Sequence, residues 1–308
     1  MANGGAGVFY GDQPGVLVFA ADEMAGRAAA DAVNALGARL SGPVPIAVAL
    51  DRLETQAGAD AILIEAGAGH PALDDLFHAL RQGSEDRRYN VVASVPAALI
   101  DHAYAQLDGD NIQLIADPEP ADRVAALHLA IGGSPSRVAD IDAEAGAARL
   151  RQLSEEVARI ARALSALSSD EGRRRPSVTR DTPPLADDGE PIEAEQVRAV
   201  IRARRLRSQI FDPELFSDPA WDMLLDLTAA RLEDKQVAVS SLCIAAAVPP
   251  TTALRWIKTM TDAGLFLRRA DPMDGRRVYI TLSDDAADGM EQYMIHTRRL
   301  MREVYSTA

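Results

Sequence analysis

Residues 264–283 read GLFLRRADPMDGRRVYITLS, and their pattern indicates the fold of the C-terminal part of the chain. Two runs of β-forming residues, 265–267 and 278–282, flank a segment that contains Asp274-Gly275. Asp-Gly is typical of tight turns because both residue types adopt turn conformations readily. The stretch therefore predicts a β-hairpin whose connecting segment, 268–277, is rich in arginine.

Two short helices are predicted immediately before the hairpin. Ser240 is expected to cap a helix over 241–246, and a helix over 251–263 follows Val248-Pro-Pro250 and stops at Gly264. Helix, tight turn and helix form a helix-turn-helix, and a hairpin directly after it is a wing. The rest of this α+β domain, over 193–308, is expected to comprise helices at 192–211 and 218–232, the second one capped by Asp218, and an edge strand at 237–239.

Basic residues are concentrated on the two elements that would read DNA. Six bases and three acids lie between Thr251 and Arg277, although the whole of 193–308 carries a net charge of −1. Helical spacing turns Ala253, Ile257 and Met260 inward, with Trp256 beside them. Arg and Thr can contact base edges and Lys suits phosphate. The candidate DNA-binding residues are Thr251, Thr252, Arg255, Lys258, Thr259, Arg268, Arg269, Arg276 and Arg277.

Gly264-Leu265, the Asp-Gly-Arg-Arg turn at 274–277 and Thr281-Leu-Ser283 together resemble the MarR family of winged-helix transcription regulators, over about residues 195–305. The resemblance implies that helix 251–263 enters the major groove and that wing Arg276, with Arg277 beside it, reaches the minor groove. It also implies dimerisation through the terminal helices. In the last helix, the apolar residues expected at the dimer contact are Met290, Tyr293, Met294, Leu300 and Met301.

A second dimer contact is predicted upstream, in a helix over 140–168. Leucine, valine and isoleucine recur there at spacings of three and four residues, which is the seam of a coiled coil. A parallel homodimeric coiled coil is favoured over the alternative, a helix packed on the N-terminal domain. The seam residues are Leu150, Leu153, Val157, Ile160, Leu164 and Leu167. Residues 169–192, rich in proline and charge, are expected to form a flexible linker.

Residues 14–135 alternate short apolar runs with helical stretches, and residues 1–13 are expected to be a flexible N-terminus. Strands that are apolar on both faces suit a parallel sheet covered by helices, so a doubly wound α/β domain is predicted. Its expected strands are 16–20, 45–49, 61–64, 90–94 and 111–115, and its expected helices are 25–40, 72–81, 97–107 and 121–131.

The order and size of these elements resemble a bacterial response-regulator receiver domain. The positions that match the family's phosphorylation pocket read Asp22, Glu65, Ser94 and Asp117. Glu65 is too long for in-line attack on a phosphoryl group, and Asp117 cannot clamp one as lysine does. The pocket is therefore expected to be degenerate. Its carboxylates are solvated residues at a sheet edge, or a phosphate-independent site for a ligand or partner, or a surviving phosphoryl acceptor.

Composition limits the remaining function classes. The 308 residues carry a net charge of −14, and residues 1–140 alone carry −11, so the acidity belongs to the N-terminal domain. The single cysteine, Cys243, is expected to be buried in a protein made for a reducing compartment. No basic leader or membrane span is evident, which indicates a cytoplasmic protein. The sequence offers no metal cluster, cofactor motif or catalytic set, so no enzyme is predicted.

These observations predict a cytoplasmic bacterial transcription regulator that binds double-stranded DNA as a homodimer. A protein or small-molecule signal at the N-terminal domain would act by shifting the dimer geometry and so the spacing of the two recognition helices, although a flexible linker transmits orientation poorly. Two alternatives stay open at this point. One is a working, phospho-accepting response regulator, and the other is an adaptor that uses the winged helix for protein contacts.

Overall fold

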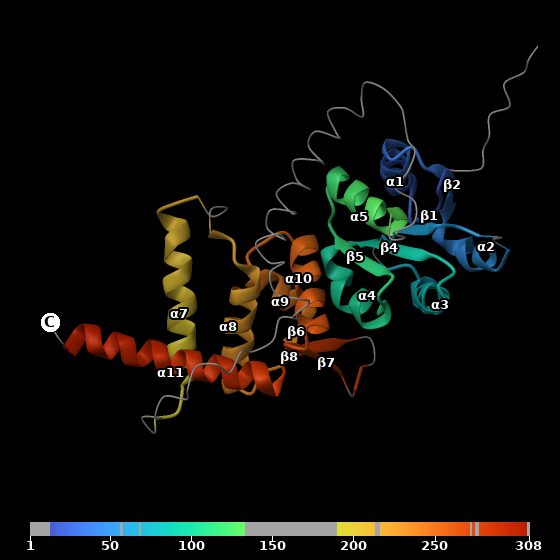
Figure 1. Ribbon diagram of the computed structural model, residues 1–308. Helices are drawn as coiled ribbons and strands as arrows, with labels where there is room; N and C mark the ends of the chain where they lie inside the picture. The colour runs from blue at the N-terminus through green and yellow to red at the C-terminus, as the bar shows by residue number, and fades with distance from the viewer. Residues whose placement is uncertain are drawn as a thin grey trace, which may run out of the picture.

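The computed structural model describes residues 13–132, except 56, 57 and 68, and residues 190–306, except 213–215, 272, 275 and 276. The predicted coiled coil, most of the predicted linker and Arg276 lie outside the described residues. Two bodies are present, an α/β domain and a smaller domain that contains a helix-turn-helix (Figure 1).

The α/β domain is built on a five-stranded parallel sheet of order β2-β1-β3-β4-β5. This is the flavodoxin-like doubly wound order. The elements are β1 (Gly15–Ala20), α1 (Glu23–Ala35), β2 (Arg39–Pro45), η1 (Ile46–Val48), α2 (Ala49–Thr55), β3 (Ala61–Glu65), α3 (Leu73–Glu85), β4 (Asn90–Val95), η2 (Ala97–Leu99), α4 (Ile100–Gln106), β5 (Ile112–Ala116) and α5 (Pro120–Gly132).

Helices cover both faces of the sheet. Alternate residues of β1 point to opposite faces, so Val16 and Val18 pack with α1 and α5, whereas Leu17 and Phe19 pack with α2, α3 and α4. All six residues of β1 and all five of β3 are buried. This two-sided burial explains the continuous apolar runs that predicted a parallel sheet.

The predicted second strand, 45–49, is wrong. The strand lies earlier, at β2, and Ile46 begins a turn of 3₁₀ helix that leads into α2. β2 is an edge strand whose residues are half-buried or exposed, so it lacks an apolar run. Ile46 and Ala49 are buried because they lie on one side of this helical segment, at i and i+3.

The C-terminal domain follows the predicted order. Its elements are α7 (Ala194–Leu206), η3 (Arg207–Gln209), α8 (Pro219–Leu232), β6 (Val237–Ala238), α9 (Val239–Ala245), α10 (Pro250–Asp262), β7 (Phe266–Ala270), β8 (Val278–Leu282) and α11 (Asp284–Ser306). The predicted cap of α8 is confirmed, because Asp218 Oδ1 accepts a hydrogen bond of 3.3 Å from the Trp221 amide. The three strands form an antiparallel sheet of order β6-β8-β7.

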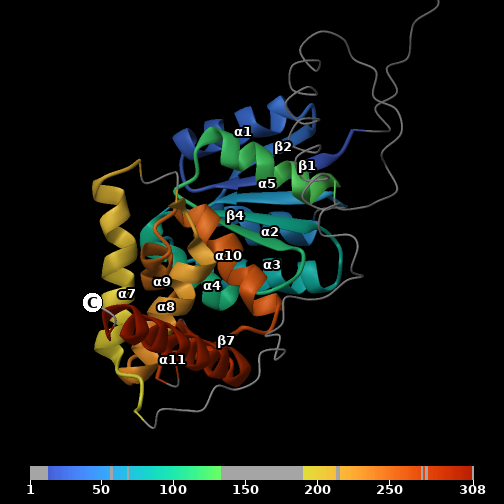
Figure 2. The same cartoon turned by 60° about the vertical axis from the view of Figure 1, so that its left-hand side comes forward.

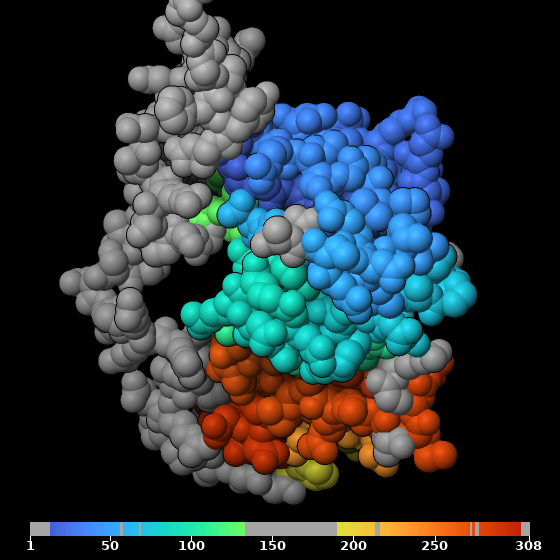
Figure 3. Space-filling model, turned by 90° about the vertical axis from the view of Figure 1, so that its right-hand side faces the viewer, coloured from blue at the N-terminus to red at the C-terminus, as the bar shows by residue number. Residues whose placement is uncertain are grey.

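The two domains pack directly against each other. β5, the edge strand of the parallel sheet, lies beside α10, and α4 lies beside α9 (Figures 1 and 2). Their buried apolar residues form one continuous cluster. Figure 3 shows the α/β domain seated on the winged-helix domain along this boundary. Within the described residues, no helix has the length and apolar character needed to cross a membrane.

Candidate nucleic-acid interface

The second helix of the helix-turn-helix, α10, separates an apolar face from a polar one. Proline occupies its first turn, and Gly264 just past its end has a φ of +74°. The buried residues are Ala253, Leu254, Ile257 and Met260, and Trp256 is half-buried against the same core. On the other face, Arg255 and Thr259 are exposed, whereas Thr251, Thr252 and Lys258 are partly covered.

The wing is a short hairpin that pairs Phe266 with Leu282 at its base and Ala270 with Val278 near its tip. Asp271 organises the tip. Its Oδ1 accepts a hydrogen bond of 2.8 Å from the Met273 amide, and its Oδ2 accepts one of 3.0 Å from the Tyr279 hydroxyl. These donors hold the pKa of Asp271 below its ordinary value, with the Met273 amide contributing most.

Two bases on the wing are available to a ligand. Arg277 has a side chain that is 64% exposed and lies 3.6 Å from Asp274 Oδ2. Arg269 is exposed, and its Nε donates to Thr281 Oγ1 at 3.3 Å. Exposed charges of this kind suit phosphate contacts.

Ser240 does not cap α9, which corrects the sequence-based prediction. α9 begins one residue before Ser240, at Val239, and its N-cap residue, Ala238, makes no side-chain capping bond. The Ser240 amide and hydroxyl instead donate to Asp101 of α4, at 2.8 Å and 2.6 Å. Asp101, which belongs to the α/β domain, thus supplies the side-chain acceptor for a backbone amide in the first turn of α9.

Three of the nine predicted DNA-binding residues contact the α/β domain. Thr251 Oγ1 donates to the Ala116 carbonyl at 3.0 Å and accepts from the Ala116 amide at 3.1 Å. Lys258 Nζ lies 3.9 Å from Asp110, at the N-terminal side of β5. The third residue is Arg268, on β7.

Arg268 is held by three groups around α4. Its guanidinium pairs with Asp108, donates to the Tyr104 carbonyl at 2.7 Å, and stacks 4.5 Å from the centroid of the Tyr104 ring. Burial raises the pKa of the Tyr104 hydroxyl, and the Arg268 charge opposes this rise. In this arrangement of the domains Arg268 contacts the α/β domain, and its contact with DNA stays a prediction.

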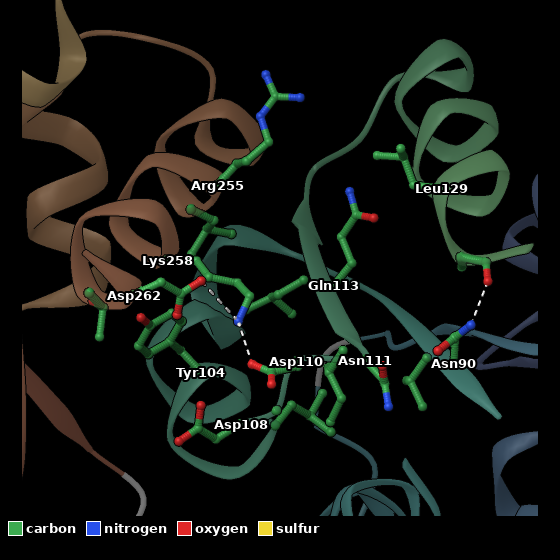
Figure 4. Close-up of a pocket in the computed structure, with 18 of the residues that line it drawn as sticks. Asn90, Tyr104, Asp108, Asp110, Asn111, Gln113, Leu129, Arg255, Lys258 and Asp262 are labelled. Carbon is green, nitrogen blue, oxygen red and sulfur yellow. Dashed lines mark hydrogen bonds and ion pairs between the residues drawn. The ribbon is translucent and has the colours of Figure 1, made fainter. Parts of the chain in front are cut away.

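A cavity of about 440 Å³ lies between β5, α5 and α10. Figure 4 shows Lys258 reaching across it to Asp110, while Arg255 extends away from this pair, on the same side as Gln113 of β5. The walls combine both signs of charge with apolar side chains such as Leu129. Among the described residues, Arg255 makes no ion pair, so its charge is free for a ligand.

The predicted phosphorylation pocket of the α/β domain is filled by an ion pair. Glu65, at the end of β3, is 5% exposed, and its Oε1 lies 2.7 Å from Nε of Arg123 on α5. Ser94 Oγ donates to Glu65 Oε2 at 2.6 Å. Arg123 also donates to the Pro118 carbonyl at 2.7 Å. The sequence analysis did not identify Arg123, because a basic residue near the start of a helix is usually a solvent-exposed surface residue.

The other two pocket residues have local structural roles. Asp22 caps α1, with Oδ1 accepting from the Ala25 amide at 2.8 Å. Asp117 has a φ of +43°, and its Oδ2 accepts from the Ala97 amide at 3.2 Å. Glu65 is therefore not a solvated carboxylate, whereas Asp22 and Asp117 lie near the surface.

The predicted dimer residues of α11 fall into two groups. Met290 and Met294 are 4% exposed and belong to the core of this chain, because α11 packs on α8. Tyr293, Leu300 and Met301 are 41%, 62% and 54% exposed, and Tyr293 makes an edge-on contact with Trp221. Only the exposed group is available to a second copy of the chain.

Cys243 is buried on α9, as is expected of a cysteine that acts as a small apolar residue. Burial, with a smaller contribution from the charge of Asp101, raises the pKa of its thiol to about 12. A thiol in this state is inert at neutral pH.

No protein-family model and no curated protein matches the chain. Solved structures resemble part of it. MepR of Staphylococcus aureus bound to ethidium bromide is 14% identical, covering 38% of this chain and 83% of its own, with a TM-score of 0.27. Transcriptional regulator Tm0710 of Thermotoga maritima is 15% identical, over 37% and 78%, with a TM-score of 0.27. A probable transcriptional regulator of Pseudomonas aeruginosa is 21% identical, over 37% and 80%, with a TM-score of 0.23. Likeness at this level says nothing about function.

Proposed function

We propose that this chain is a DNA-binding transcription regulator of the MarR type, acting in the cytoplasm as a homodimer without enzymatic activity. The observation that carries the proposal is the helix pair α9 and α10 followed directly by the hairpin β7–β8, with basic and hydroxyl side chains on the outward surface of both elements. α10 would enter the major groove, and the wing would follow the minor groove.

The α/β domain supports a regulatory role that is independent of phosphorylation. The carboxylate of Glu65, which matches the acceptor of receiver domains, is already paired with Arg123 and hydrogen-bonded to Ser94. A carboxylate paired and hydrogen-bonded in this way is a poor nucleophile toward a phosphoryl group. We infer a receiver-like domain that responds to a protein or small-molecule signal.

DNA binding is tested with labelled random-sequence duplex DNA at increasing salt. Wild type is expected to bind with an affinity that falls as salt rises, because binding releases counterions from phosphates. Arg255→Ala/Arg277→Ala should bind about tenfold more weakly, with a shallower salt dependence. Arg27→Ala/Arg81→Ala removes the same charge from α1 and α3 and should bind like wild type. No binding by wild type at low salt would refute the proposal.

A second candidate, a protein-interaction adaptor, is favoured by one observation. α10 already binds protein, since Thr251 is hydrogen-bonded to the backbone of β5. The same titration separates the two functions, because an adaptor would show no salt-dependent affinity for duplex DNA.

A further inference from the structure

The first turn of α10 is engaged by the chain's own α/β domain. In a helix-turn-helix protein, the N-terminal residues of the second helix contact base edges. Thr251 occupies this place, and its hydroxyl both donates to and accepts from Ala116, the last residue of β5. Leu254, one turn later, lines the cavity that α10 shares with β5. The end of the helix that would enter the groove first therefore lies against β5 and is partly covered by it.

Acidic residues of the α/β domain face the bases of the winged helix. Asp108 pairs with Arg268, and Asp110 lies 3.9 Å from Lys258. Asp108 and Asp110 thus add negative charge from the α/β domain beside two cations that the proposed function assigns to DNA, and Asp262 of α10 lies 3.6 Å from the same Lys258 Nζ. The Arg268 side chain is only 20% exposed, so it cannot contact DNA while it is held between Asp108 and Tyr104. Part of the negative charge of the N-terminal domain thus lies at its contact with the winged helix.

The contact is also anchored outside the DNA-reading surface. Asp101 accepts two hydrogen bonds from Ser240 of α9, and apolar residues of both domains form one continuous cluster. Figure 3 shows close packing of the two domains along this boundary. Among the described residues, Asp101 and Ser240 form no hydrogen bond or ion pair with a predicted DNA-binding residue, so substitutions there can loosen or lock the contact without removing such a residue.

We propose that the α/β domain inhibits DNA binding by docking α4 and β5 onto the first turn of α10 and the first strand of the wing. The domain and DNA then compete for one surface, and only the undocked form admits α10 to the major groove. This inference rests on the proposed DNA-binding function. Arg255, Thr259 and Arg269 stay exposed in the docked form and leave it a weak, non-specific affinity for DNA.

The first test loosens the contact from the α/β side. Asp101→Ala/Asp108→Ala removes hydrogen bonds and an ion pair to the winged helix and leaves every predicted DNA-binding residue in place. Hydrogen bonds to charged groups of this kind are worth enough to raise the apparent affinity for labelled random-sequence duplex DNA about tenfold. Asp31→Ala/Asp51→Ala removes the same charge from exposed sites on α1 and α2 and serves as the matched control. Equal affinity of the two variants would overturn the inference.

The second test locks the contact reversibly. Asp101→Cys/Ser240→Cys places one thiol on each domain, at two positions whose present side chains are joined by a hydrogen bond of 2.6 Å, and oxidation is expected to join the domains by a disulfide. The oxidised variant should bind DNA at least about tenfold more weakly than the same sample after reduction. Asp101→Cys alone, with Cys243 present, should not respond to oxidation. Equal binding before and after reduction would overturn the inference while DNA binding stands, whereas no binding in either state refutes the proposed function itself.

Discussion

Nε of Arg123 lies 2.7 Å from Oε1 of Glu65, at the carboxyl end of the parallel sheet. The two side chains are 15% and 5% exposed, so the pair is largely removed from water. Loss of either partner would leave an unpaired buried charge, which lowers the free energy of unfolding. An ion pair thus occupies the site that the receiver resemblance would assign to phosphotransfer.

Removing one partner of this pair should destabilise the α/β domain. Arg123→Ala leaves Glu65 buried with only Ser94 as a partner, and we expect the free energy of unfolding in urea to fall by about 3 kcal/mol. Glu65→Leu/Arg123→Leu should lower the free energy of unfolding by less than Arg123→Ala does, because no charge stays buried. An Arg123→Ala variant as stable as wild type would show that the pair contributes nothing.

Phosphoryl donors should not modify the chain. After incubation with acetyl phosphate and Mg²⁺, intact mass is expected to be unchanged for wild type, because Glu65 is occupied by Arg123 and Ser94. A stoichiometric phosphoryl adduct would contradict the degenerate pocket and favour a working response regulator. Glu65→Gln would then show whether this residue carries the adduct.

The exposed apolar end of α11 should mediate dimerisation. Leu300 and Met301 are 62% and 54% exposed, and exposed apolar residues in such numbers mark an interaction surface. Leu300→Glu/Met301→Glu is expected to increase the monomer fraction in sedimentation velocity runs. Met24→Glu, at a 79% exposed site on α1, is the matched control and should leave the distribution unchanged. A purely monomeric wild type would contradict the dimer.

Cys243 should make stability fall at alkaline pH. Its pKa is raised to about 12 by burial in the folded chain, whereas an unfolded cysteine titrates near its ordinary value of 9.0. Above that value the unfolded chain releases a proton that the folded chain keeps, so the stabilisation present below pH 9 is lost as the pH rises toward 12. The stability difference between wild type and Cys243→Ala should shift against wild type by about 1 kcal/mol per pH unit in this range. A pH-independent difference would exclude a buried neutral thiol.

Much of the fold could be predicted because its elements have strong local patterns. The buried strands β1, β3, β4 and β5 are continuous apolar runs, and Asp218 with Pro219 marks the start of α8. The exposed edge strand β2 has no such pattern, and its place was wrongly given to the segment around Ile46. Burial on both faces is visible in a sequence, whereas edge pairing depends on a neighbouring strand.

The residues that surround the predicted sites could not be predicted from the sequence. Arg123 lies 58 residues from Glu65, and Ser240 lies 139 residues from Asp101. No periodicity links such distant positions, so the ion pair in the α/β domain and the contact between the domains emerged only from the three-dimensional arrangement. Arg268 was assigned to DNA by its position on the wing, and its neighbours Asp108 and Tyr104 come from the other domain.

The hydrogen bonds between Thr251 and Ala116 join two parts of one chain, so the fraction of docked molecules does not depend on protein concentration. Apparent affinity for an operator then equals the intrinsic affinity multiplied by the undocked fraction. If roughly one molecule in a hundred is undocked, operator occupancy requires roughly a hundredfold more protein. A signal that binds the undocked α/β domain more tightly would lower this threshold without changing a single contact to DNA.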